Sequence, residues 1–228
     1  MELIIIIVAL IAIIVVNSIM KINIKELEKI ALNQGLNEIT KKYPKNIEIC
    51  TDILEILGNK TTKIEEDETS EATLYLVTHD KISIGNTHES FTRIQTMAHE
   101  CLHSIQDKKM LLFNFVFSNI YFIYFILTCI LLVARKLPNE IMFSNILLIL
   151  SLIYYTIRIF LENDAMIKAE FVAKDYIQKH SISSKEEVER LCEGFKKINN
   201  QGIKGTNCSL FVKIMIKVVI FNALALIF

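Results

Sequence analysis

Glycine and proline are scarce in this chain, with six Gly and two Pro in 228 residues. Both residues interrupt regular elements and mark turns, so their scarcity favours long helices over a fold rich in β-strands. An excess of charge of one sign is also missing, because 25 basic residues balance 25 acidic ones. Nucleic-acid-binding proteins ordinarily carry a basic surface, so the composition indicates no nucleic-acid partner.

The cysteines lack the spacing of a disulfide framework or of a cysteine-based zinc site. Five are present, and no two of them form a C-x-x-C pair. An odd number without such pairs is typical of reduced thiols in the cytosol.

Apolar sequence is abundant. Hydrophobic residues make up 52% of the chain and the mean hydropathy is +0.41, which is higher than in soluble domains. Residues 3–16 are almost wholly aliphatic and the apolar run extends to Met20, so that residues 1–20 match the roughly 20 residues needed to span a bilayer. A cleaved secretory signal is the alternative, but the start Met1-Glu2 is not basic and no Ala-x-Ala pattern follows. We therefore expect a retained membrane anchor.

Three more apolar stretches follow. Residues 110–134 and 141–161 are joined by a short polar link that contains Pro138, so we expect a helical hairpin in the membrane. Residues 210–228 form a weaker span with Lys213 and Lys217 near its start, whose stems could extend to the headgroups. A helix that lies in the membrane interface is the alternative for this segment.

Basic residues near the ends of these stretches predict the orientation. They follow the first and third spans and precede the second and fourth: Lys21, Lys25, Lys29, Lys108, Lys109, Lys168, Lys174 and Lys204. The opposite side has only Arg135 and Lys136. The bias predicts a multi-pass protein of the cell membrane, with the polar segments 21–109 and 162–209 in the cytosol and the N-terminus outside.

The polar segments together are long enough for one hydrophobic core. Their patterns predict two helices, an acidic loop and a β-hairpin before the central helix, at 24–42, 46–57, 60–71 and 72–84 in that order. Pro44 ends the first of these helices and Gly58 the second. Asn86 and Glu89 have the spacing of a capping pair at the start of the central helix.

That central helix carries the most informative motif of the chain, an H-E-x-x-H from His99 to His103. Residues four apart lie one turn above each other on a helix, so the two imidazoles can bind one zinc ion. Glu100 lies about 100° round the helix, where a general base must be to take a proton from water at the metal. Cys101 could be a thiol ligand, but it points away from the His99/His103 face, so we expect it to pack as a small apolar residue.

A catalytic zinc usually has three protein ligands and one open position, so a third ligand must come from elsewhere. Glu162 is the best candidate, because it stands where the third apolar stretch meets the polar segment that follows it. Ala165 and Ala169 share its helical face and would let this helix approach the histidines. Asp164 and Glu170 are the reserves, and the alternative is that Glu162 merely ends a membrane span.

Two motifs resemble those of a known family. Residues 99–106, HECLHSIQ, and 162–169, ENDAMIKA, are similar to the H-E-V-G-H-A-I-Q helix and the later E-F-D-A-S-x-x-A segment of bacterial membrane zinc metallopeptidases of the YugP type. More distantly the chain resembles the HtpX-like and CAAX-prenyl-protease gluzincins. The membrane layout agrees over nearly the whole chain. Cys101-Leu102 in place of Val-Gly and Met166 in place of Ser are departures from the family pattern.

The resemblance implies that His99, His103 and Glu162 bind Zn²⁺ and that Glu100 is catalytic. It also implies that Asp164 orients a ligand, although on a helix Asp164 faces away from Glu162. The expected fold is mainly α: a polytopic protein with about four transmembrane helices and a cytosolic gluzincin-like metallopeptidase domain that carries a small β-hairpin. It would lie in a bacterial cell membrane, with its active site facing the cytosol.

These observations predict a zinc endopeptidase that cleaves proteins or peptides at the cytosolic membrane face. We expect the substrate to add a strand to the hairpin edge, beside Leu74, Leu76, Ile82 and Ile84. A second donor to the oxyanion stays open among five residues, His79, His88, Arg158, Tyr176 and His180. The main alternative is a non-enzymatic membrane scaffold or immunity-type protein, whose structural zinc would need a fourth ligand such as Cys101 or His88. A metal-dependent transporter is a weaker third possibility, because the spans carry few ionisable residues.

Overall fold

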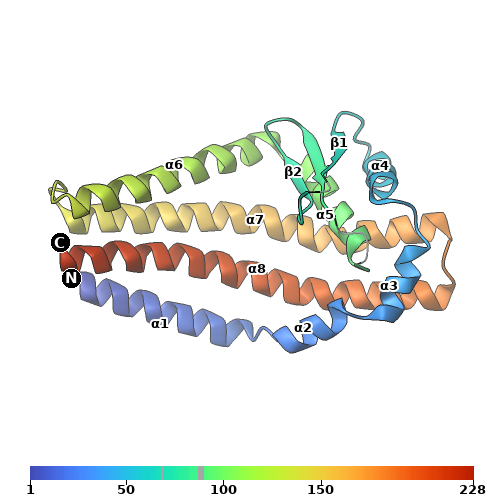
Figure 1. Cartoon of the computed structure of the whole chain (residues 1–228), viewed down its shortest axis with the longest axis horizontal. Coiled ribbons are helices and arrows are strands. Elements are labelled where there is room, and N and C mark those ends of the chain that lie inside the picture. The colour runs from blue at the N-terminus through green and yellow to red at the C-terminus, as the bar shows by residue number, and fades with distance from the viewer. Residues whose placement is uncertain (68, 87–89) are drawn as a thin grey trace. The chain divides into compact units, whose positions relative to one another are not determined.

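The computed structural model describes residues 1–67, 69–86 and 90–228 of the chain. It is mainly helical, with a small three-stranded sheet and several long apolar helices (Figure 1). In chain order the elements are α1 (Glu2–Met20), α2 (Ile24–Ala31), α3 (Gln34–Lys41), α4 (Asn46–Ile56), β1 (Lys63–Glu66), β2 (Leu74–Leu76), β3 (Lys81–Ile84), α5 (Arg93–Ile105), α6 (Lys108–Val133), α7 (Glu140–His180) and α8 (Lys185–Ile227).

The chain divides into two compact units. The apolar unit comprises Met1–Ile22, Phe113–Phe160 and Lys204–Phe228, and the polar unit comprises Asn23–Leu112 and Leu161–Ile203. α7 and α8 each contribute to both units as uninterrupted helices, since neither contains proline. The assignment of 21–109 and 162–209 as one metallopeptidase domain stays a prediction.

The apolar unit is built from helices whose outer faces are hydrophobic. Its core contains the aromatic side chains of Tyr121 and Phe221 together with Leu147 and Val218, all at most 1% exposed. The ammonium of Lys217 lies 4.2 Å from the centre of the Tyr121 ring. Four of the described helices, α1, α6, α7 and α8, are long and apolar enough to cross a membrane, judged by length and composition.

The polar unit has a conventional hydrophobic core. α4 packs on α5, and the sheet, in the order β1-β3-β2, covers both helices. Strand β3 pairs with β1 in parallel and with β2 in antiparallel register, and alternate residues Ile82 and Ile84 point into the core. From α7 the small side chains of Ala165, Ala169 and Ala173 are buried in the same cluster, as their shared helical face predicts.

A buried arginine fixes the start of the central helix. The Arg93 guanidinium, only 4% exposed, donates hydrogen bonds to the carbonyl oxygens of Thr40, Tyr43 and Pro44 and to the side chain of Asn46. Thr40 lies at the end of α3, where carbonyls lack a donor from the next turn, and Arg93 adds a donor there; Tyr43 and Pro44 lie in the connection to α4. Burial lowers the pKa of Arg93 from its usual value. The first residue of α5 is thereby attached to the α3–α4 connection.

Three local expectations were wrong or lie partly outside the described residues. The helix expected over 24–42 is two helices, because the Asn33 side chain accepts a hydrogen bond from the backbone of Leu36 and caps a new start. The expected loop 60–71 contains β1, whose pairing with β3 is non-local and leaves no local signal. The central helix begins at Arg93 rather than at Asn86, and Glu89 lies outside the described residues.

Candidate metal centre

The two motif histidines lie one turn apart on α5. Their rings are edge to face with centroids 4.6 Å apart, and the two Nε2 atoms are separated by 3.1 Å. The opposite side of the helix holds Met97, Ala98 and Cys101 in the core, each fully buried. This packing fixes the rotation of α5 and leaves both imidazoles on its other face.

Glu162 of α7 completes a group of three. One carboxylate oxygen lies 3.5 Å from Nε2 of His99, and the other lies 3.9 Å from Nε2 of His103. One ligand atom from each residue lies within 4.8 Å of the others. Two tetrahedral zinc ligands, each about 2.1 Å from the ion, are about 3.4 Å apart, so the donor types and spacings fit a zinc ion.

Glu100 lies beside this group and is held from the sheet. Its Oε1 is 3.9 Å from Nε2 of His99, and its Oε2 accepts a 2.6 Å hydrogen bond from the backbone N–H of Tyr75 in β2. The Glu100 side chain is 9% exposed. A carboxylate that is oriented by a backbone donor and lies beside the three possible ligands could act as a general base if a metal binds there.

Asp164 contacts the site through Gln106, the residue that follows α5. Gln106 Nε2 lies 3.0 Å from Asp164 Oδ2, and Gln106 Oε1 lies 2.8 Å from Nδ1 of His103. Burial opposes ionisation of Asp164, but hydrogen bonds from Lys168 and Gln106 outweigh it and lower the pKa of this carboxyl below its usual value. The expected role of Asp164 in orienting a ligand thus has a physical route through Gln106 to His103.

The other ligand candidates lie elsewhere. Cys101 Sγ is 3.4 Å from Cys50 Sγ, and burial raises the pKa of the Cys101 thiol well above its usual value, so Cys101 packs as the expected apolar residue. Glu170 is not part of the group of three, which within residues 1–67, 69–86 and 90–228 contains no fourth acidic, histidine or cysteine ligand. His88 lies outside the described residues.

For the remaining candidates for an oxyanion donor, the contacts described below are with residues outside the group of three. Tyr176 is buried against Tyr43, with ring centroids 6.2 Å apart, and burial raises its pKa. His180 lies 3.3 Å from the carboxylate of Asp52. His79 contacts the Thr78 hydroxyl on the exposed β2–β3 turn, and Arg158 belongs to the apolar unit.

The predicted substrate-binding residues divide into two pairs. Leu74 and Leu76 are exposed on β2, at 51% and 36%. Ile82 and Ile84 are buried in the core, at 0% and 2%, because they occupy the inward positions of the alternating strand β3. Burial leaves these two side chains almost no exposed surface, and whether they contact a substrate stays a prediction.

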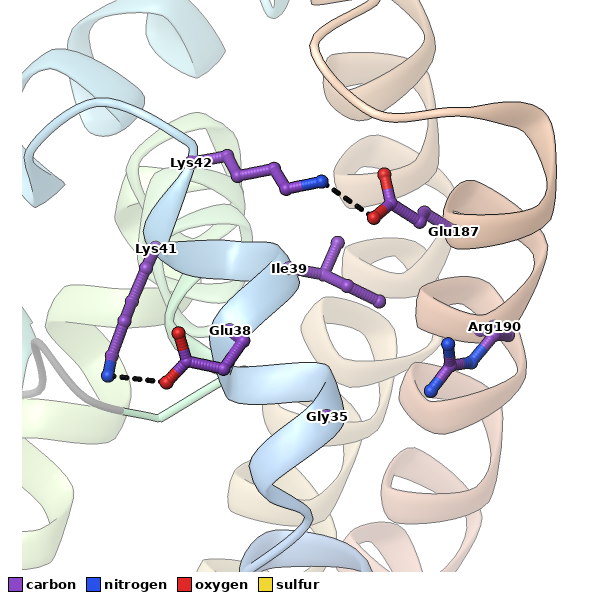
Figure 2. Close-up of a pocket in the computed structure, with 7 residues that line it drawn as sticks. All are labelled: Gly35, Glu38, Ile39, Lys41, Lys42, Glu187 and Arg190. Carbon is purple, nitrogen blue, oxygen red and sulfur yellow. Dashed lines mark hydrogen bonds and ion pairs between the residues drawn. The ribbon is translucent and has the colours of Figure 1, made fainter.

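A separate open pocket of about 550 Å³ lies between α3 and the start of α8. Figure 2 shows Lys42 directed toward Glu187 and Lys41 toward Glu38, with nitrogen–oxygen distances of 2.6 and 2.7 Å. Its lining, which also includes Gly35, Ile39 and Arg190, shares no residue with the metal group. Paired surface charges of this kind are ordinary features of a solvated face.

Two contributors to the site were not anticipated. Gln106 is three residues after His103, a spacing that brings side chains together at the end of a helix and could have indicated the contact. The contact from the Tyr75 backbone N–H could not be predicted from the sequence, because every residue except proline carries such a donor.

Comparison of the chain with protein-family models, with curated proteins and with solved structures finds no match.

Proposed function

We propose that this chain is a membrane-embedded zinc endopeptidase of the gluzincin type. The observation that carries the proposal is the position of Glu100, held by β2 with one carboxylate oxygen 3.9 Å from Nε2 of the ligand His99. The residues that would hold zinc are His99, His103 and Glu162. A structural zinc would require a fourth protein ligand, whereas three ligands are typical of a catalytic site.

Glu100 carries the proton transfers of the proposed reaction. When bound, a zinc ion lowers the pKa of water and polarises the substrate carbonyl. Glu100 takes a proton from the attacking water, whose oxygen bonds to the carbonyl carbon. Glu100 then gives that proton to the amide nitrogen as the carbon–nitrogen bond breaks. The peptide bond and one water molecule thus give one carboxyl product and one amine product. The N–H of Tyr75 keeps the carboxylate aimed at the reacting atoms.

The outer edge of β2 is the proposed substrate edge. The N–H of Tyr75 points away from β3, since it donates to Glu100, and in an antiparallel strand the C=O of the same residue points the same way. The far edge of β3 is paired with β1. Because Glu100 already accepts from the N–H of Tyr75, an extended peptide at this edge would donate to the C=O of Tyr75. Such a peptide would pass beside Glu100 and contact the exposed Leu74 and Leu76.

We further propose that α1, α6 and the apolar parts of α7 and α8 cross the cell membrane, with the polar unit in the cytosol. The length and composition of these helices support the first point, and the distribution of lysines supports the second. The substrates would be proteins or peptides at the cytosolic face of the membrane.

The test uses the full-length protein purified in detergent with zinc, incubated with an unfolded protein such as reduced casein. Glu100→Gln is expected to retain zinc and to lower the cleavage rate by about 10²–10⁴-fold, the usual contribution of a general base. Glu55→Gln, an exposed carboxylate on α4, is the matched control and should cleave like the wild type.

The same variant identifies substrates in cells. Proteins that accumulate in membranes with Glu100→Gln, but not with Glu55→Gln, are the expected physiological substrates. Equal cleavage by Glu100→Gln and the wild type would refute the enzyme proposal. Stoichiometric zinc without cleavage of any protein or membrane peptide would favour the scaffold with structural zinc.

A further inference from the structure

We propose that Gln106 is a positioning residue that sets the tautomer of His103 and joins the histidine helix to the turn of α7 that carries Glu162. This inference deepens the proposed function and rests on it for the role of zinc. Its basis is one carboxamide group with three polar contacts, all within the polar unit.

The contacts connect two elements that are distant in sequence. Gln106 follows directly on α5, and its side chain reaches back to Nδ1 of His103 at 2.8 Å. Its other end reaches α7, where Nε2 lies 2.9 Å from the carbonyl oxygen of Leu161 and 3.0 Å from Oδ2 of Asp164.

The chemistry of these partners decides which way the carboxamide faces. A backbone carbonyl oxygen only accepts hydrogen bonds, so the group that meets Leu161 must be the –NH₂ of Gln106. The carboxamide oxygen therefore faces His103, and an oxygen of this kind only accepts. Of the two neutral tautomers of His103, only the one with the proton on Nδ1 can donate to it.

The consequence for the metal is direct. With the proton on Nδ1, Nε2 keeps its lone pair, and Nε2 is the atom that faces Nε2 of His99 at 3.1 Å and Glu162 at 3.9 Å. Metal-bound histidines commonly donate their second ring N–H to a carbonyl or carboxylate, which fixes the ring and its tautomer. Gln106 gives His103 that partner before any metal binds.

The same side chain also places Glu162. Leu161 precedes Glu162 and Asp164 follows it on one turn of α7. The –NH₂ of Gln106 donates hydrogen bonds to both residues and so attaches this turn to the end of α5. Lys168, one turn further along, lies 2.5 Å from the other oxygen of Asp164 and holds this carboxylate in place. Removal of the carboxamide would leave the His103 ring without its partner at Nδ1. It would also remove the hydrogen bonds that join the end of α5 to α7.

The experiment compares Gln106→Met and Gln106→Glu with the wild type, each as the full-length protein in detergent. Methionine matches the length of glutamine without its polar atoms, whereas glutamate restores an acceptor for His103 but no donor for α7. Gln178→Met, at an exposed position of α7, is the control. Zinc affinity is measured by competition with a chelator, and the ligand field by the absorption spectrum of the cobalt-loaded protein.

Gln106→Met is expected to bind zinc about 10–100-fold more weakly, the usual effect of losing such an outer partner, and to change the cobalt spectrum. Gln106→Glu should recover part of the affinity, and Gln178→Met should match the wild type. Wild-type affinity and an unchanged cobalt spectrum in Gln106→Met would overturn the role of Gln106. Absence of zinc binding by the wild type would instead overturn the proposed function.

The tautomer is tested without metal. Nitrogen NMR of the metal-free wild type, labelled at histidine, should show His103 protonated at Nδ1 and not at Nε2. A signal from the opposite tautomer would overturn the inference whether or not the protein is a peptidase. Because this measurement uses the wild type, it holds even if a Gln106 variant fails to fold.

Discussion

The two units differ in whether their large apolar side chains face the interior of the unit or its surface. The core of the polar unit buries large hydrophobic residues such as Ile49, Phe91 and Phe195, each at 0% exposure. In the apolar unit many face outward, and Ile123 on α6 and Ile149 on α7 are 61% and 57% exposed. Hydrophobic burial drives folding only against water, so the outward apolar faces are consistent with the proposed membrane location of this unit, which stays a proposal.

The two units also differ in the kind of polar group that they bury, which is charged in one and neutral in the other. The polar unit buries a charged guanidinium, that of Arg93, and surrounds it with oxygen acceptors. The apolar unit pairs neutral groups between its helices, with Asn222 bonded to Ser144 and Tyr121 to Ser151. Neutral pairs of this kind link helices in hydrocarbon, where each unsatisfied polar group is costly.

The largest expected effect concerns the chemistry, which we assign to the polar unit alone. Glu162→Ala should weaken zinc binding by about 10³-fold or more, beyond the 10–100-fold effect of outer-sphere changes, because it removes one of the three proposed ligands. Glu170→Ala, eight residues along the same helix, is the control and should bind zinc as the wild type does. Equal zinc content of the two variants, measured by metal analysis, would remove Glu162 from the site.

The second prediction concerns the buried arginine. Arg93→Met removes the guanidinium donor from four oxygen acceptors and should lower the free energy of unfolding by about 3 kcal/mol or more. Arg190→Met, at the open pocket, should change it by less than about 0.5 kcal/mol. Thermal unfolding followed by circular dichroism in detergent measures both, and similar melting temperatures would contradict the structural role of Arg93.

The third prediction tests the contrast between the units directly. Ile123→Lys places a charge near the middle of α6 and should cost about 2.5–3.5 kcal/mol if that face meets lipid. Ile182→Lys, exposed in the α7–α8 connection, should be nearly neutral. The measurement is the fraction of full-length protein that resists alkaline extraction from membranes. Equal fractions for the two variants would argue that water, and not lipid, surrounds α6.

The smallest effect concerns a pH-dependent ion pair of the polar unit. A hydrogen bond from Lys108 is the main cause that lowers the pKa of Asp80, and Thr62 and Tyr75 add to it. The stabilisation is therefore fully present above the ordinary aspartate pKa of about 4 and is lost as the pH falls through the lower pKa of the folded state.

Asp80→Asn should accordingly lower stability by less than about 1 kcal/mol at neutral pH, since the pair is partly exposed. The difference from the wild type should shrink as the pH falls below 4. Denaturant unfolding at several pH values checks this trend, and a difference that grows toward acid would show that the sign is wrong.

The elements that follow from local sequence patterns were the ones predicted. The helix that bears His99 and His103, the helix ended by Gly58 and the hairpin strands all have local periodicity or turn residues, and the structure confirms them. Strand β1 was missed because its parallel partner β3 is reached only through the fold. Glu162 was predicted as a ligand from its place after an apolar hairpin, and whether it binds zinc stays a prediction.

By itself the sequence determined the residue types of the site and their spacing on α5, because helical periodicity is a property of neighbouring residues. Only the tertiary structure decided which groups outside α5 meet them. The carboxylate of Glu162, the carboxamide link of Gln106 to α7 and the N–H of Tyr75 are brought to the histidines by the packing of α7 and the sheet around α5. The physical reason is that hydrogen bonds and metal ligation act over a few ångströms in space, whereas sequence patterns report only distances along the chain.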